Sequence, residues 1–240
     1  MRWFYRMASP PHFYRWAQRY APWFGGVSLL LLVWGTYGAL IGSPPDYQMG
    51  DGVRIIFVHV PAAWLSMMSY TLMAVAAGIG LIWRMKLAHA VAAACAPIGA
   101  AFTFLTLVSG SLWGKPMWGT WWEWDARMTS ELLLLFLFLG YIALRNSFTE
   151  RDKADRVSAI LAVVGVINVP IIHFSVDWWN TLHQPASVTR MDAPGIHASM
   201  LTPLLVMAIG FTLFFAYVLL VRTQGEILLR ERQTKWVNEL

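Results

Sequence analysis

Six apolar runs constrain the fold of this chain more than any other feature of its sequence. Each is close to the about 20 helical residues that cross the hydrocarbon core of a membrane. Backbone groups in lipid must be hydrogen-bonded internally, so each run is predicted to be a helix. The runs cover residues 23–42, 61–83, 90–112, 128–144, 157–174 and 198–221. The predicted fold is therefore all-α: a polytopic integral membrane protein with six transmembrane helices that form one domain over residues 1–240.

The composition agrees with a membrane protein, because 58% of the residues are hydrophobic and only 13% are charged. An ordinary soluble domain is about 25% charged. The first twenty residues are aromatic and basic rather than apolar, so no cleavable signal peptide is predicted. The single cysteine, Cys95, forms no intramolecular disulfide, and the sequence holds no CxxCH motif for covalent haem attachment.

Lysine and arginine predict the orientation of the helices. If the N-terminus is inside, fourteen of the 18 basic residues lie in inner segments. Both termini are then cytoplasmic. The inner basic residues are spread over four separate segments, so no nucleic-acid partner is predicted. The outer segments hold the other four: Arg54, Lys115, Arg127 and Arg190.

Tryptophan is concentrated in the outer stretch between the third and fourth runs, WGKPMWGTWWEWDARMTSE, where five fall within twelve residues. They are Trp113, Trp118, Trp121, Trp122 and Trp124. A belt that anchors helix ends at the membrane interface is the simplest interpretation. The density exceeds what anchoring needs, because Trp178 and Trp179 lie in the next outer segment. A rigid aromatic shelf for a large flat ligand is the sharper hypothesis.

The local pattern predicts how this shelf is built. Thr120 and Glu123 have the spacing of a capping box, and Pro116 and Gly119 break the chain just before it. A short helix from Trp121 is therefore expected. Helical spacing would place on one face Trp121, Trp124, Asp125 and Met128.

Four of the six histidines fall at the outer face: His59, His173, His183 and His197. His59 precedes Pro61 at the top of the second run, and His183 lies in a loop close to two tryptophans. A histidine near a membrane surface is most often a structural polar residue. Two neutral imidazoles beside an aromatic shelf would, however, suit the axial positions of a haem iron.

Haem propionates would need cationic partners, and the fork of an arginine suits a carboxylate. Arg127 follows the tryptophans directly, and Arg54 lies five residues before His59. An ion pair of Arg127 with Asp125 or Glu131 is an equally good interpretation, because charges near a membrane usually pair.

Three stretches resemble a known family over essentially the whole chain: VHVPAAW, GSLWGKPMWGTWWEWDARMTSELLLL and INVPIIHFSVDWWNTLHQPAS. Together they are similar to CcmC, the haem exporter protein C family of cytochrome c maturation. The tryptophan-rich "WWD" segment of that family corresponds to residues 113–130. One departure is Met128, where leucine is usual. The resemblance carries nothing over for Arg190, Asp192 or His197.

The resemblance implies that haem b is bound at the periplasmic face of a bacterial inner membrane. It assigns the axial ligands to His59 and His183. It assigns the haem platform to Trp113, Trp118, Trp121, Trp122, Trp124 and Asp125. Arg54, Arg127 and His173 are candidates for contacts to the propionates or to the ligands.

The same resemblance implies delivery of haem rather than enzymatic turnover. Haem would be presented for covalent attachment to the periplasmic chaperone CcmE. The CcmA ATPase, CcmB and the small CcmD would form an ABC-type complex with the chain in the lipid bilayer.

Two other classes of function stay open at this point. A haem b-bearing membrane subunit of a quinone oxidoreductase would hold its ligands on facing helices inside the bundle. A transporter would line its path with the tryptophans and would have broken or charged helices near the membrane centre. The six runs carry almost no central charge.

Overall fold

A computed structural model of the chain describes residues 8–179, 181, 183 and 196–240. The described chain is helical, which confirms the predicted all-α class. Six segments are long and apolar enough to cross a membrane: Pro10–Gly42, Asp51–Trp83, Lys86–Trp118, Ala126–Asn146, Arg151–Trp178 and Ala198–Glu231. Each contains one of the predicted apolar runs and extends beyond it, because polar and aromatic residues continue the helices past the hydrocarbon core.

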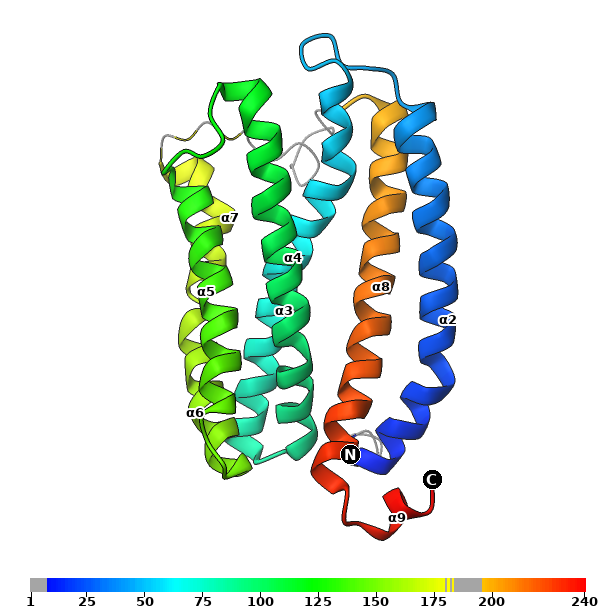
Figure 1. The fold of residues 1–240 in the computed structure, drawn as a ribbon, viewed down its shortest axis with the longest axis vertical. Coiled ribbons are helices and arrows are strands. Elements are labelled where there is room, and N and C mark those ends of the chain that lie inside the picture. Colours follow the sequence, from blue (N-terminus) through cyan, green and yellow to red (C-terminus); the bar gives the residue numbers. More distant parts are fainter. Residues whose placement is uncertain (1–7, 180, 182, 184–195) are drawn as a thin grey trace.

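Helix α2 (Pro10–Tyr37) and helix α8 (Ala198–Glu231), the first and last long helices, pack against each other along most of their length (Figure 1). The Ser28 hydroxyl donates to the Gly210 carbonyl at 2.9 Å. Gly35 lies directly against Met207 and has no room for a Cβ atom. The other faces of α2 expose many large apolar side chains, as expected for a helix in contact with lipid. A π-helical turn, η1 (Gly38–Gly42), ends α2.

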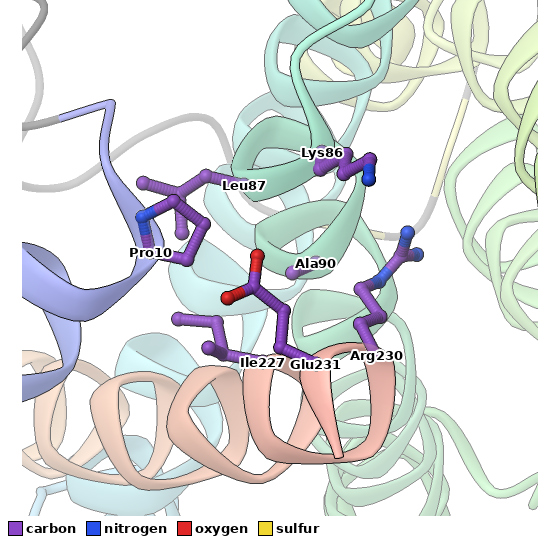
Figure 2. Close-up of a pocket in the computed structure, with 7 residues that line it drawn as sticks. All are labelled: Pro10, Lys86, Leu87, Ala90, Ile227, Arg230 and Glu231. Carbon is purple, nitrogen blue, oxygen red and sulfur yellow. The ribbon is translucent and has the colours of Figure 1, made fainter. Parts of the chain in front are cut away.

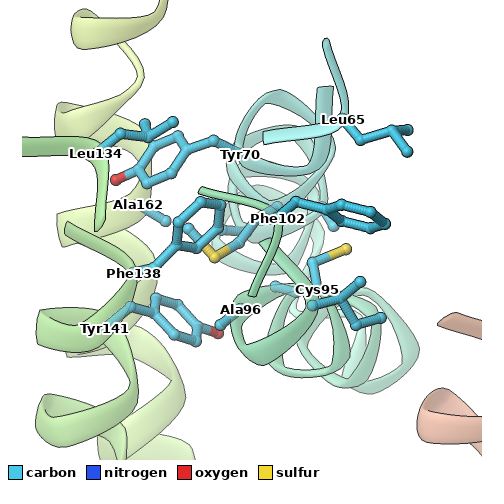
Figure 3. Close-up of a cluster of buried hydrophobic side chains, with 14 of the residues drawn as sticks. Leu65, Tyr70, Cys95, Ala96, Phe102, Leu134, Phe138, Tyr141 and Ala162 are labelled. Carbon is cyan, nitrogen blue, oxygen red and sulfur yellow. The ribbon is translucent and has the colours of Figure 1, made fainter. Parts of the chain in front are cut away.

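The remaining helices form a second group beside this pair (Figure 1). They are η2 (Asp51–Ile55), α3 (Ile56–Trp83), α4 (Lys86–Trp118), α5 (Ala126–Asn146), α6 (Arg151–Gly165) and α7 (Asn168–Trp178). Tyr70, Phe138 and Tyr141 fill its core with small residues of α4 such as Ala96 (Figure 3). Gly99 is essential to this packing, because a Cβ atom there would overlap the ring of Phe138.

The fifth predicted span, 157–174, is interrupted rather than continuous. Helix α6 ends at Gly165, and α7 begins at Asn168 after a turn at Val166 and Ile167. Pro170 has no N–H group to bond the Val166 carbonyl, which weakens a continuous helix at this point. The buried Asn168 side chain donates to the Ser130 carbonyl of α5 at 2.8 Å. A broken helix is the feature that the transporter interpretation predicted.

Charged residues tie the helices together at the end of the bundle that carries both termini (Figure 1). Arg230 of α8 makes two bonds, of 2.6 and 2.7 Å, to the buried carboxylate of Asp155 on α6. Arg145 of α5 pairs with Glu226 of α8 at 2.6 Å. Figure 2 shows Arg230 and Glu231 beside Lys86 and Leu87, where α8 approaches the start of α4.

Candidate functional site

The start of α3, the end of α4 and the start of α5, which carry predicted site residues, lie together at the end of the bundle opposite the beginning of α2 (Figure 1). Four parts of the chain contribute: the start of α3, the last turns of α4, the linker before α5, and the residues after α7. The alternation of six spans across the membrane brings these segments to one side although they are far apart in sequence.

His59 lies in the first turn of α3, and its Nδ1 atom is 3.0 Å from the hydroxyl of Ser109 on α4. That hydroxyl already donates its single hydrogen to the Leu105 carbonyl at 2.6 Å. The Ser109 oxygen must therefore accept a hydrogen bond from His59. The imidazole is then protonated at Nδ1, and the lone pair of Nε2 is available.

His183 lies beyond α7, and its Nδ1 atom is 2.7 Å from Oδ2 of Asp125. The Thr181 hydroxyl donates to the same carboxylate oxygen and also accepts from the His183 backbone N–H. The other oxygen, Oδ1, accepts from the Met128 backbone N–H at 2.8 Å, so Asp125 is the N-cap of α5. Asp125 thus fixes His183 to the start of a transmembrane helix.

The electrostatics of Asp125 determine the proton position on His183. Burial raises the pKa of this carboxyl, but hydrogen bonds from His183, Thr181 and the Met128 N–H outweigh burial and lower its pKa to about 2. An ionised carboxylate only accepts hydrogen bonds. His183 must therefore donate from Nδ1, which leaves the lone pair of Nε2 available, as at His59.

Helix α4 provides one tryptophan to each of these histidines. Trp113 meets the His59 ring edge-on, with centroids 5.7 Å apart, and Trp118 meets the His183 ring in the same way at 4.9 Å. The two tryptophans are five residues apart, which is about 7.5 Å along a helix. The two histidines are close enough for a charge on one to act on the other. The structure thus brings together five of the predicted site residues around the end of α4: His59, His183, Trp113, Trp118 and Asp125.

The predicted short helix from Trp121 is wrong. Helix α4 continues through Pro116 to Trp118 and ends at Gly119, whose φ of +78° is favourable for glycine and stops the helix. Residues 120–125 are not helical. Thr120 forms a local turn with Trp122 rather than a helix cap. The cap falls instead at Asp125, which begins α5.

Without that helix, the predicted common face of the tryptophans is wrong as well. Trp121 and Trp124 are 54% and 73% exposed, whereas Asp125 and Met128 are buried. Trp122 packs edge-on against Trp124 at 5.3 Å. Its indole N–H is buried and has no hydrogen-bond partner among the described residues. The five tryptophans therefore form an inner pair on the histidines and an outer group of three.

Two of the predicted cations, Arg127 and Arg54, form hydrogen bonds to backbone carbonyls near the site. Arg127 donates to the Ser175 hydroxyl at 3.1 Å and to the His173 carbonyl at 3.3 Å, which joins α5 to α7. Within the described part of the chain it forms no ion pair with a carboxylate, so the predicted pairing with Asp125 or Glu131 is not observed.

Arg54 bonds the Ala39 and Leu40 carbonyls at the π-helical turn and pairs with Asp51 at 2.9 Å. Lys115 bonds the Gly119 carbonyl at 3.0 Å. The predicted outer cation Arg190 and the nearby Asp192 lie outside the described residues.

The two other outer histidines have local contacts. The exposed ring of His173 packs edge-on against Phe174, with centroids 4.7 Å apart. His197 accepts a hydrogen bond from the Ser199 N–H and is the N-cap of α8.

Ser109 and Thr181 were not found from the sequence, although both contact a predicted ligand. Thr181 had a local signal, because a threonine hydroxyl can accept a hydrogen bond from the backbone N–H two residues further on, here that of His183. Ser109 had none, since its partner His59 is fifty residues away. Among the described residues, no group of three or more histidine, cysteine, aspartate and glutamate side chains forms a metal site.

Comparison with known proteins gives matches over nearly the whole chain. A family model described as "Heme exporter protein C" matches residues 3–238. Heme exporter protein C of Escherichia coli K12 is 51% identical over 98% of this chain and 95% of its own length. The Haemophilus influenzae protein of the same name is 46% identical over 100% and 97%. A ccmC-like mitochondrial protein of cytochrome c biosynthesis from Marchantia polymorpha is 43% identical over 88% and 89%.

Proposed function

The chain belongs to the heme exporter protein C (CcmC) family of multi-pass membrane proteins that handle haem in cytochrome c maturation, and we propose that it holds haem between His59 and His183. In this proposal residues 1–240 form one domain. The site is proposed to lie on the periplasmic side of the bacterial inner membrane, with both termini in the cytoplasm, and the distribution of lysine and arginine supports this orientation.

One observation carries this proposal: the Nδ1 atoms of both histidines are occupied by hydrogen bonds to oxygen. Ligating histidines typically donate their other ring N–H to a carboxylate or another oxygen, which fixes the tautomer and the ring orientation. Both Nε2 atoms are thus ready to bind iron. Two histidines at the same end of the bundle share this arrangement, with Nδ1 bonded to oxygen and Nε2 left for a ligand, which supports a common role for them.

The remaining chemistry of the site fits a porphyrin. The macrocycle supplies four nitrogen ligands, so two protein imidazoles complete six coordination. Trp113 and Trp118 would border the axial ligands, and the buried N–H of Trp122, which has no acceptor among the described residues, would be a donor for an anionic group. The absence of a CxxCH motif in the sequence favours non-covalent haem b. Arg54, Arg127 and His173 stay candidates for propionate contacts.

The quinone oxidoreductase alternative predicts ligands on facing helices inside the bundle. His59 lies in the first turn of α3, and His183 lies beyond the end of α7. This placement at one end of the bundle favours presentation of haem to a partner over electron transfer across the membrane. The exposed Trp121 and Trp124 give the partner an aromatic surface beside the cargo.

The partner in this proposal is the periplasmic chaperone CcmE, to which haem becomes covalently attached. CcmA, CcmB and CcmD complete the complex, and ATP hydrolysis by CcmA releases the loaded chaperone. The chain itself acts as a delivery factor within this ABC-type assembly.

The test is an absorption spectrum of the purified, haem-loaded protein, followed by incubation with CcmE. We expect a low-spin spectrum typical of two imidazole ligands, and covalent transfer of haem to CcmE. A high-spin spectrum with normal transfer would show that the two histidines do not bind the iron at the same time. A low-spin spectrum without transfer, in the complete CcmABCD complex, would exclude the delivery function.

A further inference from the structure

The two candidate ligands have unequal hydrogen-bond partners. His183 donates to an ionised carboxylate, Asp125, at 2.7 Å. His59 donates to a neutral hydroxyl, Ser109, at 3.0 Å. Hydrogen bonds in which one group is ionised are shorter and roughly twice as strong as neutral ones. The two sides of a haem held here would therefore differ electronically.

This difference changes how strongly each imidazole binds iron. A carboxylate that accepts the Nδ1 proton raises the basicity of the ring and strengthens its Nε2 atom as a ligand. The Ser109 hydroxyl raises the basicity of His59 less, because it is neutral: it donates its hydrogen to the Leu105 carbonyl and accepts from His59 with a lone pair. His183 is thus the stronger electron donor.

The placement of Asp125 makes its effect on His183 persistent. One carboxylate oxygen is fixed by the backbone N–H of Met128 at the start of α5, and the other contacts both His183 and Thr181. The carboxylate cannot turn away from His183 without uncapping a transmembrane helix. The arrangement therefore orients the ring as well as making it more basic.

We propose that Asp125 is a positioning residue that makes His183 the retained axial ligand, whereas His59 is the ligand displaced when another group binds the iron. The inference rests on the proposed function, since it needs both histidines on the iron. During delivery, an incoming group would bind the iron on the side of His59, and His183 would stay bound to the iron until haem is transferred.

The matched variants are Asp125→Asn and Ser109→Ala. Asparagine is as good an N-cap as aspartate, so the start of α5 is kept. It removes the negative charge and turns an amide toward His183. Ser109→Ala removes the neutral partner of His59, and its hydroxyl otherwise bonds only carbonyls of its own helix. Each variant therefore alters one ligand.

The first measurement is the midpoint potential of the bound haem. A strong anionic partner stabilises the ferric state, so Asp125→Asn is expected to shift the potential in the positive direction. Ser109→Ala is expected to cause a clearly smaller shift. A merely structural role of Asp125 would lower haem content but would leave the potential of the remaining haem unchanged. Equal shifts in the two variants would overturn the inference.

The second measurement asks which ligand leaves. Carbon monoxide added to the ferrous protein replaces one imidazole, and the Fe–C and C–O stretching frequencies report the ligand that stays. If His59 leaves, Asp125→Asn shifts these frequencies and Ser109→Ala does not. The reverse pattern would show that His183 is displaced and would overturn the proposal.

Two outcomes separate this inference from the proposed function. If wild-type protein lacks a low-spin two-imidazole spectrum, the proposed function fails and the inference fails with it. If that spectrum is present but the variants show the reverse pattern, only the inference fails. Should Asp125→Asn lose haem altogether, the carbon monoxide complexes of wild type and Ser109→Ala still decide. Identical frequencies support displacement of His59, and different frequencies contradict it.

Discussion

The Asn168 side chain donates to the Ser130 carbonyl at 2.8 Å, and this bond ties the break between α6 and α7 to the first turns of α5. Both residues are buried. Ser130 lies three residues from Arg127, which bonds α7 further along through the Ser175 hydroxyl. Two bonds on neighbouring turns thus fix α7 against α5, directly before the segment that carries His183.

Loss of the Asn168 amide is expected to destabilise the protein. Asn168→Ala removes one buried hydrogen bond, while the Ser130 carbonyl keeps its bond within α5, so the expected cost is about 0.5–1.5 kcal/mol. Thermal unfolding in detergent measures the effect. Thr212→Ala is the control, because its exposed hydroxyl bonds only the Ala208 carbonyl one turn away. Equal melting temperatures for the two variants would contradict a structural role for the Asn168 bond.

A methyl group at Gly99 is expected to separate α4 from α5. Gly99→Ala places a Cβ atom on the ring of Phe138, and overpacking of this kind costs about 1–3 kcal/mol. Gly26→Ala adds the same methyl group to α2, where nothing lies within 4 Å. The difference between the two melting temperatures measures the cost of overpacking. If Gly26→Ala is the less stable variant, the described α4–α5 packing is wrong.

Ring removal at either proposed ligand is expected to be repaired by free imidazole. His59→Gly and His183→Gly each leave one protein ligand and a cavity of ring size, so the haem spectrum should become high-spin. Added imidazole should restore the low-spin spectrum in both. His173→Gly should keep two-imidazole ligation.

The control for these variants is His12→Gly near the N-terminus. His89 is less suitable, because its ring is packed tightly against Gly80. An unchanged spectrum in His59→Gly or His183→Gly, without imidazole, would exclude that residue as a ligand.

The inner and outer tryptophans are expected to affect different steps. Each indole buries about 150–250 Å² on contact. The double variant Trp113→Ala and Trp118→Ala should weaken haem binding, because these rings pack on the histidines. Trp121→Ala with Trp124→Ala should keep bound haem but lower transfer to CcmE, since these rings are exposed. Haem titration and CcmE labelling measure the two steps, and equal losses in both assays would argue against the division.

The orientation is expected to follow the distribution of lysine and arginine. Reporter fusions after Lys115 should be active in the periplasm. Fusions after Lys86 and Lys153 should be active in the cytoplasm. A cytoplasmic reporter after Lys115 would place the His59 and His183 end of the bundle inside the cell and would exclude the proposed site.

The six spans were predictable because membrane insertion depends mainly on the length and hydropathy of a segment. Their ends were less predictable. Helix α4 passes through Pro116, although this proline has no N–H for the Leu112 carbonyl, and stops only where Gly119 adopts a positive φ. Pro170 is a local signal for the break before Asn168, but the bond from Asn168 to the Ser130 carbonyl of α5 is not visible in any local pattern.

The candidate site was predictable in its residue types but not in its contacts. The resemblance pointed to His59, His183 and the tryptophans by motif. The capping-box pattern at Thr120 and Glu123 was misleading, because residues 120–125 form a non-helical linker and the helix cap is Asp125, at the start of α5. The pairing of Asp125 with His183 spans 58 residues and depends on how α5 and α7 pack, which spacing alone does not determine.

The pairing of α2 with α8 has a consequence for how the protein is made. Ser28 and Gly210 are 182 residues apart, so α2 leaves the ribosome long before α8 and finds this partner only when α8 has been inserted. Until then the Gly35 face of α2, against which Met207 packs, stays exposed to the bilayer. The central helices have more local partners, because α3 packs mainly on α4, and α4 also packs on α5, so most of their contacts can form earlier. The packing of α8 on α2 is therefore a late step in assembly, and a chain that stops before α8 would leave α2 without its main packing partner among the described helices.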